Sequence, residues 1–472
     1  MPKNKLPIIF SVFLLYLLLC HLPSVIIAGT FSVNLEKGTL SITAENVPLQ
    51  SILLKLAAEG ITVKIDPAIN PNIKANFKNR PIEQALESIL KPASHSLLWE
   101  AKNQGNTKPA IQLTEIHVFQ SGKKNLMKTL KPRRTEVITK NKKGFFYVKG
   151  EILLYIPPGT DLAELKKLIQ SYNGTLVDSM GLPGMVKVLL PENADVFAIA
   201  REIKSKLNLE VSQPNYAHPI QAPVHYGIGT TQADLDPGFY APTDNSVPIA
   251  ILDSGLDDNI ELNKFVISSL DVIDPNTPIT DTLGHGTQMA FIASGIVKPY
   301  GSVADNESYI PIIPIRAFDD NGYTTDFKIM DSINFALANN AKVLSLSWGS
   351  ETRSDFMEKS FAYANSKGLI VVASAGNEPT GKPVYPAAYP SVIGVGALGP
   401  HGKTWEKSNF GNFVALYAPG FANLPVGHKG DPGLYAGTSI SAAFVANTIA
   451  NYLSENPAAT LQEINDYLNK KY

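Results

Sequence analysis

The sequence contains 472 residues, a formal net charge of −1 and a single cysteine. At about 150 residues per domain, this length predicts about three domains, each large enough to bury its own core. No long block of one charge sign dominates the chain, so nothing in the composition calls for nucleic acid or an anionic membrane as a partner. The composition therefore favours a protein or peptide partner.

The first residues have the pattern of a secretory signal peptide. Two lysines precede an apolar run at residues 8–19, which is short for a membrane span, and small residues follow it. We expect cleavage near residue 28, with a retained anchor as the alternative, and lipidation of Cys20 is disfavoured because Leu19 before it is bulky. Without residues 1–28 the exported chain would contain no cysteine, so its stability would depend on core packing and cysteine-based catalysis is excluded.

Residues 30–120 contain two similar units in succession. Each has a proline just before an apolar pattern at helical spacing, Pro48 in the first and Pro81 in the second, where the missing N–H costs nothing. Alternating stretches at 61–65 and 111–114 predict strands beside these helices. The resulting α+β module resembles the short N-terminal domains of secretins and TonB-dependent receptors. That resemblance implies a binding or tethering unit with a partner in the cell envelope.

Residues 146–218 form a second small unit, in which strand, helix, strand, helix and strand follow one another. This order predicts an open sheet with two helices on one face, as in a ferredoxin-like domain. The unit ends in Pro214-Asn215-Tyr216. It resembles the inhibitory propeptide of bacterial subtilisin-like proteases, in which such an ending precedes the catalytic domain. The predicted strands include 151–156 and 185–190, and the predicted helices are a first one capped by Thr160 or Asp161 and a second one at 194–207.

Two stretches have the composition of linkers. Residues 121–145 are basic and show no periodicity, which is typical of a solvated linker, and a specific anionic partner is the alternative. Residues 219–246 are rich in proline and glycine. We expect a processing site in this second linker, because a self-cleavage site has to be reachable.

Strands and helices alternate over residues 247–472. Alternation of this kind predicts an α/β domain with a mostly parallel sheet and helices on both faces, here preceded by two small α+β domains. Ligands bind such sheets at the carboxyl ends of the strands, so the residues just after each strand are the candidates for chemistry. The predicted strands are 247–252, 342–347 and 369–374, and the predicted helices are 326–339 and 356–366.

Four polar residues stand at predicted strand or helix ends, and each has a structural explanation when taken alone. Asp253 and Asn377 can be turn residues, His285 can be a buried structural histidine, and Ser439 can cap the helix that begins after Gly437. Together they supply a nucleophile, a base, a carboxylate to orient the base and a donor for an oxyanion. The joint interpretation is therefore catalytic.

The motifs around these four residues resemble those of subtilisin-like serine proteases over about residues 245–465. The order Asp253, His285, Ser439 is the order of the subtilisin type. Several spaced motifs that agree make the resemblance specific. The motifs are Asp253-Ser254-Gly255, His285-Gly286-Thr287, Ala375-Gly376-Asn377, Gly437-Thr438-Ser439, and Ser408-Asn409-Phe410-Gly411 leading to Ala418-Pro419-Gly420.

The resemblance implies a role for each of the four residues. Ser439 would attack the peptide carbonyl, His285 would take and return the proton, and Asp253 would hold the imidazole. Asn377 would donate its side-chain amide to the oxyanion. His285 must be neutral to act as a base, so activity is expected to fall in acid. This chemistry requires no cofactor, and a structural calcium is neither implied nor excluded.

The resemblance also implies an extended substrate that pairs with strand edges at Ser347-Trp348-Gly349 and near Gly322-Tyr323. Trp348 stands where a leucine is usual. Its alternative role is simple burial in the core.

Two further positions distinguish this chain within the resemblance. Val384 is expected near the floor of the primary pocket, where it would favour small substrate side chains, with burial in the core as the alternative. The family usually has proline four residues after the nucleophile, where this chain has Ala443. Proline would shape the helix without supplying a reacting group, so the difference concerns the aim of the Ser439 hydroxyl.

Two classes of function follow. The first is an exported bacterial serine endopeptidase, periplasmic or secreted, made as a self-processed zymogen that acts on protein or peptide substrates and on its own propeptide. The second is a binding or scaffold protein with a degenerate subtilisin fold, which the missing proline and the N-terminal module would suit.

Overall fold

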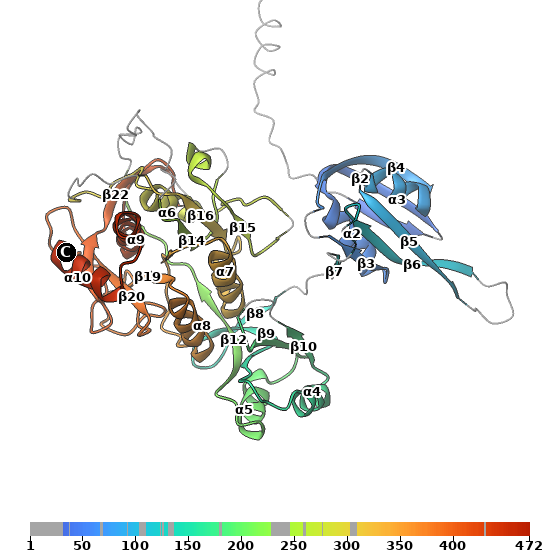
Figure 1. Cartoon of the computed structure of the whole chain (residues 1–472), viewed down its shortest axis with the longest axis horizontal. Coiled ribbons are helices and arrows are strands. Elements are labelled where there is room, and N and C mark those ends of the chain that lie inside the picture. The colour runs from blue at the N-terminus through green and yellow to red at the C-terminus, as the bar shows by residue number, and fades with distance from the viewer. Residues whose placement is uncertain are drawn as a thin grey trace, which may run out of the picture. The chain divides into compact units, whose positions relative to one another are not determined.

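The structure is a computed structural model, and its described residues fall into two compact units, 1–134 and 135–472, which we treat separately (Figure 1). The expected signal peptide at 1–28 and most of the expected processing region, 228–245, lie outside the described residues. Within the described ranges, no helix is both long enough and apolar enough to cross a membrane. Those ranges are 32–36, 38–66, 69–91, 93–102, 110–122, 124, 127–130, 136–178, 182–227, 246–257, 261–275, 277–302, 309–428 and 431–472.

The first unit is an α+β module with two small sheets. Pro48 and Pro81 each stand immediately before a helix, as the sequence predicted, and the apolar faces of both helices are buried in one core. One sheet has the order β1-β2-β4 and the other the order β5-β6-β3-β7. The elements are β1 (Ser32–Glu36), β2 (Thr39–Pro48), α2 (Leu49–Ala58), β3 (Thr62–Ile65), β4 (Asn72–Pro81), α3 (Ile82–Leu90), β5 (Ser94–Lys102), β6 (Ala110–Phe119) and β7 (Lys128–Leu130).

Two short strands occupy part of the stretch 121–145 that was expected to be a linker. β7 pairs with β3 in the first unit, and β8 (Ile138–Lys140) pairs with β9 (Phe146–Tyr155) in the second. A strand of three residues is too short to show a periodic pattern in the sequence. Its conformation is set by the strand beside it. The stretch predicted as a basic linker therefore contains two short strands that the sequence did not indicate.

The second unit begins with a module that we call the middle module, residues 136–219. Its sheet has the order β10-β11-β9-β12, with β8 on β9. The sequence missed the short strand β10, so the order is strand, helix, two strands, helix, strand. Asp161 and Asp195 cap the two helices by accepting backbone N–H groups. The further elements are α4 (Leu162–Ser171), β10 (Thr175–Asp178), β11 (Met185–Leu189), α5 (Val196–Lys206) and β12 (Val211–Pro219).

The larger part of the second unit is built on a seven-stranded sheet with the order β15-β16-β14-β18-β19-β20-β21. Every neighbouring pair in it is parallel, which confirms the predicted α/β class. Its strands are β14 (Ile249–Asp253), β15 (Leu270–Asp271), β16 (Ile312–Arg316), β18 (Val343–Leu346), β19 (Ile370–Ser374), β20 (Val392–Leu398) and β21 (Leu416–Pro419).

Helices cover both faces of this sheet, as Figure 1 shows. Alternate residues of one strand enter different cores: Ile249 and Ile251 pack with α6 (His285–Ala293) and α9 (Thr438–Glu455), whereas Ala250 and Leu252 pack with α7 (Asp326–Ala338) and α8 (Asp355–Ser366). Side chains alternate across a strand, so a strand buried on both faces is apolar throughout.

β14 lies between β16 and β18 in the sheet. From β14 the chain first adds strands on one side, β16 and β15, and then on the other side, from β18 to β21. In an open parallel sheet, such a change of side leaves a space at the carboxyl ends of the strands, where ligands bind. Asp253 ends β14, and Ser347 and Asn377 follow β18 and β19. The fold therefore gathers the predicted site residues at one edge of the sheet.

Candidate active site

Asp253 and His285 meet at this edge. The Nδ1 atom of His285 lies 2.7 Å from Oδ1 of Asp253, and both side chains are buried. His285 is the first residue of α6, and Gly284 before it has φ 78°, a left-handed conformation that glycine adopts without strain. A carboxylate on Nδ1 holds the ring with Nε2 facing away from Asp253, the arrangement that a general base requires.

A second carboxylate, Asp281, holds the start of α6 in place. Its Oδ2 accepts from the backbone N–H and the hydroxyl of Thr287 at 2.8 and 2.7 Å, and its Oδ1 accepts from the Ser254 hydroxyl at 2.8 Å. Ser254 Oγ in turn accepts from the N–H of Gly286 at 2.8 Å. These bonds join the residue after Asp253 to the residues after His285. The sequence analysis missed Asp281, although its place four residues before the histidine was visible.

Burial and charge act in opposite directions on His285. Burial is the largest single effect and lowers the pKa of the imidazole, but the charges of Asp253 and Asp281 and the hydrogen bond from Asp253 together raise the pKa above its ordinary value. The protonated ring is therefore favoured in this site. Such a shift suits a base that must hold a proton during a reaction and then return it.

Ser439 lies in the first turn of α9 and is 2% exposed. The hydroxyl of Ser347 donates to the backbone carbonyl of Ser439 at 3.3 Å. The helix runs through Ala443, the position of the missing proline, without interruption. Ser441, two residues after Ser439, donates instead to the Ala418 carbonyl at 2.9 Å.

Asn377 is fixed against the start of the same helix. Its Oδ1 accepts both the backbone N–H and the hydroxyl of Thr438, each at 2.9 Å, so its Nδ2 atom is the remaining donor. Nδ2 lies 3.5 Å, and Ser439 Oγ 2.9 Å, from the point that a Cβ on Gly437 would occupy. An amide donor and the serine hydroxyl thus lie on the same side of Gly437.

The structure joins Asp253 to His285 but forms no hydrogen bond between His285 and Ser439. His285 Nε2 is buried and has no hydrogen-bond partner among the described residues. Within the proposed set of reacting groups, the hydrogen bonds therefore establish the pair of Asp253 and His285 alone.

Of the predicted substrate-binding residues, Trp348 and Val384 are almost wholly buried. Val384 lies over Gly349: a Cβ on that glycine would come within 2.4 Å of Val384 Cγ1. Val384 also lies 3.6 Å from the Cβ position of Gly376. Trp348 packs among aromatic rings at 0% exposure.

A stretch of the chain itself crosses this edge. We call residues 217–227 the crossing segment. The end of β12 pairs antiparallel with β17 (Tyr323–Thr325), with Ala217 opposite Thr325, and the Ile220 N–H then donates to the Gly322 carbonyl at 2.8 Å. Between this segment and Ser347-Trp348-Gly349, the described residues form no backbone hydrogen bond. The predicted edge at Gly322-Tyr323 is therefore paired with the chain's own segment.

Beyond Ile220 the segment passes the serine. Gln221 Oε1 lies 3.7 Å from the Cβ position of Gly376, and Pro223 Cβ lies 3.5 Å from that of Gly437. β13 (Val224–Gly227) then pairs antiparallel with β23 (Gly433–Ala436), the strand that leads into α9. The segment is thus paired on both sides of Ser439, and residues 219–227 of the stretch predicted as a linker are held by backbone pairing.

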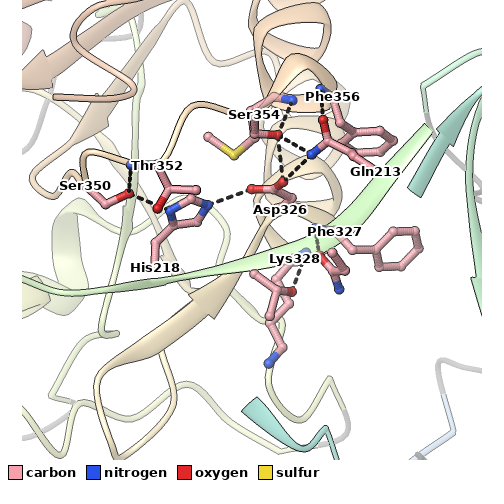
Figure 2. A network of polar contacts seen from close by, with 12 residues as sticks. Gln213, His218, Asp326, Phe327, Lys328, Ser350, Thr352, Ser354 and Phe356 are labelled. Carbon is pink, nitrogen blue, oxygen red and sulfur yellow. Dashed lines mark hydrogen bonds and ion pairs between the residues drawn. The ribbon is translucent and has the colours of Figure 1, made fainter. Parts of the chain in front are cut away.

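A buried polar network connects β12 to the starts of α7 and α8 (Figure 2). His218 Nε2 lies 2.7 Å from Asp326 Oδ1, and Gln213 Nε2 and the Ser354 hydroxyl donate to Oδ2 of the same carboxylate at 3.1 and 2.6 Å. Gln213 Oε1 accepts the N–H of Phe356 in the first turn of α8. Helix starts leave N–H groups without partners, and here β12 supplies one.

Comparisons with known proteins show the family of the chain. The family model described as the Subtilase family matches residues 244–472. The chain is 28% identical to the thermophilic serine proteinase of Bacillus sp. strain AK1, over 68% of this chain and 82% of that protein. It is 31% identical to subtilisin NAT of Bacillus subtilis subsp. natto, over 55% of this chain and 68% of that protein.

Among solved structures, fervidolysin from Fervidobacterium pennivorans, a keratinolytic enzyme related to subtilisin, aligns with a TM-score of 0.53 at 24% identity. The alignment covers 69% of this chain and 57% of that chain, and at this identity it establishes the fold alone. The family match and the relatives found by sequence establish the family as well. The chain belongs to the subtilase family of serine peptidases. These relatives do not favour the alternative of a degenerate scaffold.

Proposed function

We propose that the chain is a self-processing serine endopeptidase whose reacting groups are Ser439, His285 and Asp253. Ser439 Oγ attacks a peptide carbonyl while His285 Nε2 takes its proton, and the proton then passes to the departing amine as the peptide C–N bond breaks. Water then attacks the acyl-enzyme while His285 takes one of its protons. The ester C–O bond to Ser439 breaks, His285 returns the proton to Ser439 Oγ, and the product leaves as a carboxylic acid. The chemistry uses only side-chain and backbone groups of the chain, so we propose no cofactor for it.

The observation that carries this proposal is the path of the crossing segment. A peptide held extended along a strand edge is the substrate form that a protease of this kind binds. Here the chain's own residues are extended, paired with β17 before Ser439 and with β23 after it. The segment therefore has the placement of a substrate that spans the reacting groups.

The contacts favour one bond in this segment. The Cβ position of Gly376 lies 3.7 Å from Gln221 Oε1 and 3.6 Å from Val384 of the predicted primary pocket, whereas Pro223 lies beside Gly437, next to Ser439 Oγ. The residue whose side chain enters the primary pocket is the one whose carbonyl is attacked. We therefore propose cleavage between Gln221 and Ala222.

We propose that the middle module is the inhibitory propeptide. Its strand β12 continues into the crossing segment, so the module and the occupied site are one continuous structure. An apolar cluster that joins Met185 and Val211 of the module to Met330 and Phe356 supports the attachment, as does an ion pair of 2.6 Å between Lys328 and Glu136. A module held in this way keeps other peptides out until it is released.

The proposed bond is tested by determining the new N-terminus of the processed protein. The full chain, incubated until its mass no longer changes, is expected to yield a large fragment that begins at Ala222. A fragment that begins within 228–246, with none that begins at Ala222, would contradict the proposed register. Identical fragments from the wild type and from a chain without the Ser439 hydroxyl would show that another protease makes the cut.

Replacing Asn377 by Ala is expected to lower kcat by roughly 10²- to 10³-fold with a smaller effect on KM, because the Nδ2 donor meets charge that develops in the transition state. That magnitude was obtained in subtilisin itself and is taken from this relative. The measurement is kcat and KM on a fluorogenic peptide. Asn339→Ala is the matched control, because Asn339 lies at the far end of α7 and, among the described residues, bonds only within its own helix end, to the Phe335 carbonyl. Asn409→Ala would not serve, because the Asn409 amide binds the loop carbonyls of Ala375 and Lys382. A loss confined to KM would argue against the oxyanion role.

Further parts of the proposal rest on the sequence. We propose export to the periplasm or beyond, because residues 1–28 have the pattern of a signal peptide. For the first unit we propose tethering to an envelope protein, on the basis of its resemblance to the short domains of secretins and TonB-dependent receptors. Protein or peptide substrates follow from the family.

A further inference from the structure

With the proposed cleavage after Gln221, His218 stands three residues before the residue whose carbonyl is attacked. The His218 imidazole lies between two polar groups, with Nε2 2.7 Å from Asp326 Oδ1 and Nδ1 2.9 Å from Ser350 Oγ (Figure 2). Its ring centroid is 5.5 Å from that of Trp348, with an angle of 37° between the ring planes. We call Asp326, Ser350 and Trp348 the His218 subsite.

The three subsite residues belong to the catalytic part of the chain, whereas the residue that they hold belongs to the crossing segment. Asp326 begins α7, and Trp348 and Ser350 follow β18. When the segment has been cut and released, the subsite remains with the enzyme. The next peptide that lies along β17 in the same register presents its own side chain at the same place.

The carboxylate makes this subsite selective. Asp326 is 0% exposed, and His218 is its ion-pair partner among the residues that the structure describes. Three side chains of the described residues form hydrogen bonds with this carboxylate. Those of His218 and Gln213 belong to β12 and would leave with the middle module, whereas the Ser354 hydroxyl would stay. A buried carboxylate that loses its cationic or hydrogen-bonding partners is costly, so a replacement donor is strongly favoured.

Trp348 adds a second preference in the same direction. The negative face of an indole ring attracts cations and planar charged groups, such as the guanidinium of arginine or a protonated imidazole. A leucine at this place would offer no such attraction. Trp348, which stands where the family usually has a leucine, thus acts together with Asp326.

We infer that Asp326 and Trp348 select substrates that carry a histidine or another basic side chain three residues before the residue whose carbonyl is attacked. An acidic side chain at that position is rejected. This inference rests on the proposed function and adds a substrate class to it. His218 is then the first such side chain that the enzyme reads, in its own precursor.

The test uses the full chain after self-processing and a set of quenched fluorogenic peptides with the sequence of residues 215–226. The peptides differ only at the position of His218, which is His, Arg, Leu or Glu. We expect kcat/KM to be at least about tenfold higher for His and Arg than for Leu, and lowest for Glu, because one lost contact to a buried charge costs this much or more. This comparison needs no variant of the enzyme.

An enzyme variant locates the effect. In Asp326→Asn the ratio of kcat/KM for the His peptide to that for the Leu peptide is expected to fall about tenfold. Asp355→Asn is the matched control, since Asp355 begins α8 as Asp326 begins α7 but its side chain is 54% exposed, and the wild-type ratio should persist.

The outcomes separate this inference from the proposed function. Cleavage of all four peptides at similar rates, or faster cleavage of the Leu peptide, would overturn the inference and leave the peptidase standing. Failure to cleave any of the four peptides, or other peptides and casein, would overturn the proposed function and this inference with it.

Discussion

The Ser439→Ala chain is expected to remain at full length and to lose about 10⁶-fold in kcat on peptides, a size taken from the same loss in subtilisin. The hydroxyl is the only group that the proposed mechanism can use to form the acyl-enzyme, and the residues around it are otherwise unchanged. Intact mass after prolonged incubation and hydrolysis of a fluorogenic peptide measure the two effects.

Ser441→Ala is the control for this substitution. It removes a hydroxyl from the same helix, but that hydroxyl donates to the Ala418 carbonyl and not toward His285. Self-processing should proceed in this chain. If Ser439→Ala is processed as fast as the wild type, the cut is made by another protease, and the self-processing part of the proposal is lost.

Replacing Asp253 by Asn is expected to lower kcat by roughly 10⁴-fold and to change the pH profile as well. An amide cannot hold the imidazole in the same tautomer, and it carries no charge to stabilise the imidazolium. The pKa of His285 is raised in the intact site, and activity requires the neutral ring, so the wild-type kcat/KM should fall in acid from a point above about 6.5, the ordinary histidine value.

In the Asp253→Asn chain this acid limb is expected to move to lower pH, because burial still lowers the pKa of His285 while the main opposing charge has gone. The profile of the residual kcat/KM from pH 4 to 9 tests the shift, with Asp355→Asn as a chain that loses an exposed carboxylate. A limb that stays in place or moves to higher pH would contradict the pairing of Asp253 with His285.

The sequence was sufficient to predict the parallel sheet and the edge at which Asp253 meets His285. Runs such as residues 249–252 are apolar at every position, which is typical of a strand covered on both faces, and the structure buries alternate residues in different cores. A polar residue directly after such a run lies at the carboxyl edge, so Asp253 could be expected to meet His285. The sheet could be predicted because burial in two apolar cores leaves a clear pattern in the sequence, which local strand propensity does not.

Other features depend on partners that are distant in the chain. β10 is four residues long, and only its pairing with β11 defines it as a strand. Asp326 looks in the sequence like any acidic residue at a helix start, where negative charge is favourable. Its contact with His218 joins residues 108 positions apart, which no local pattern indicates.

The register of the crossing segment could not be predicted either. Proline-rich composition indicated a linker from residue 219, whereas pairing with β17 and β23 fixes which residue passes Ser439. A shift of one residue would turn a different set of side chains toward the enzyme. Gln221 and the His218 subsite therefore follow from the structure alone.

The claim that Ser439 is an activated nucleophile is tested most directly by labelling with a serine-directed fluorophosphonate. The processed protein is treated with the probe, digested and analysed by mass spectrometry, beside the Asp253→Asn and Ser441→Ala chains. The account predicts a single modified residue, Ser439, with slower labelling in Asp253→Asn and unchanged labelling in Ser441→Ala. Processed protein in which Ser439 stays unmodified would contradict it.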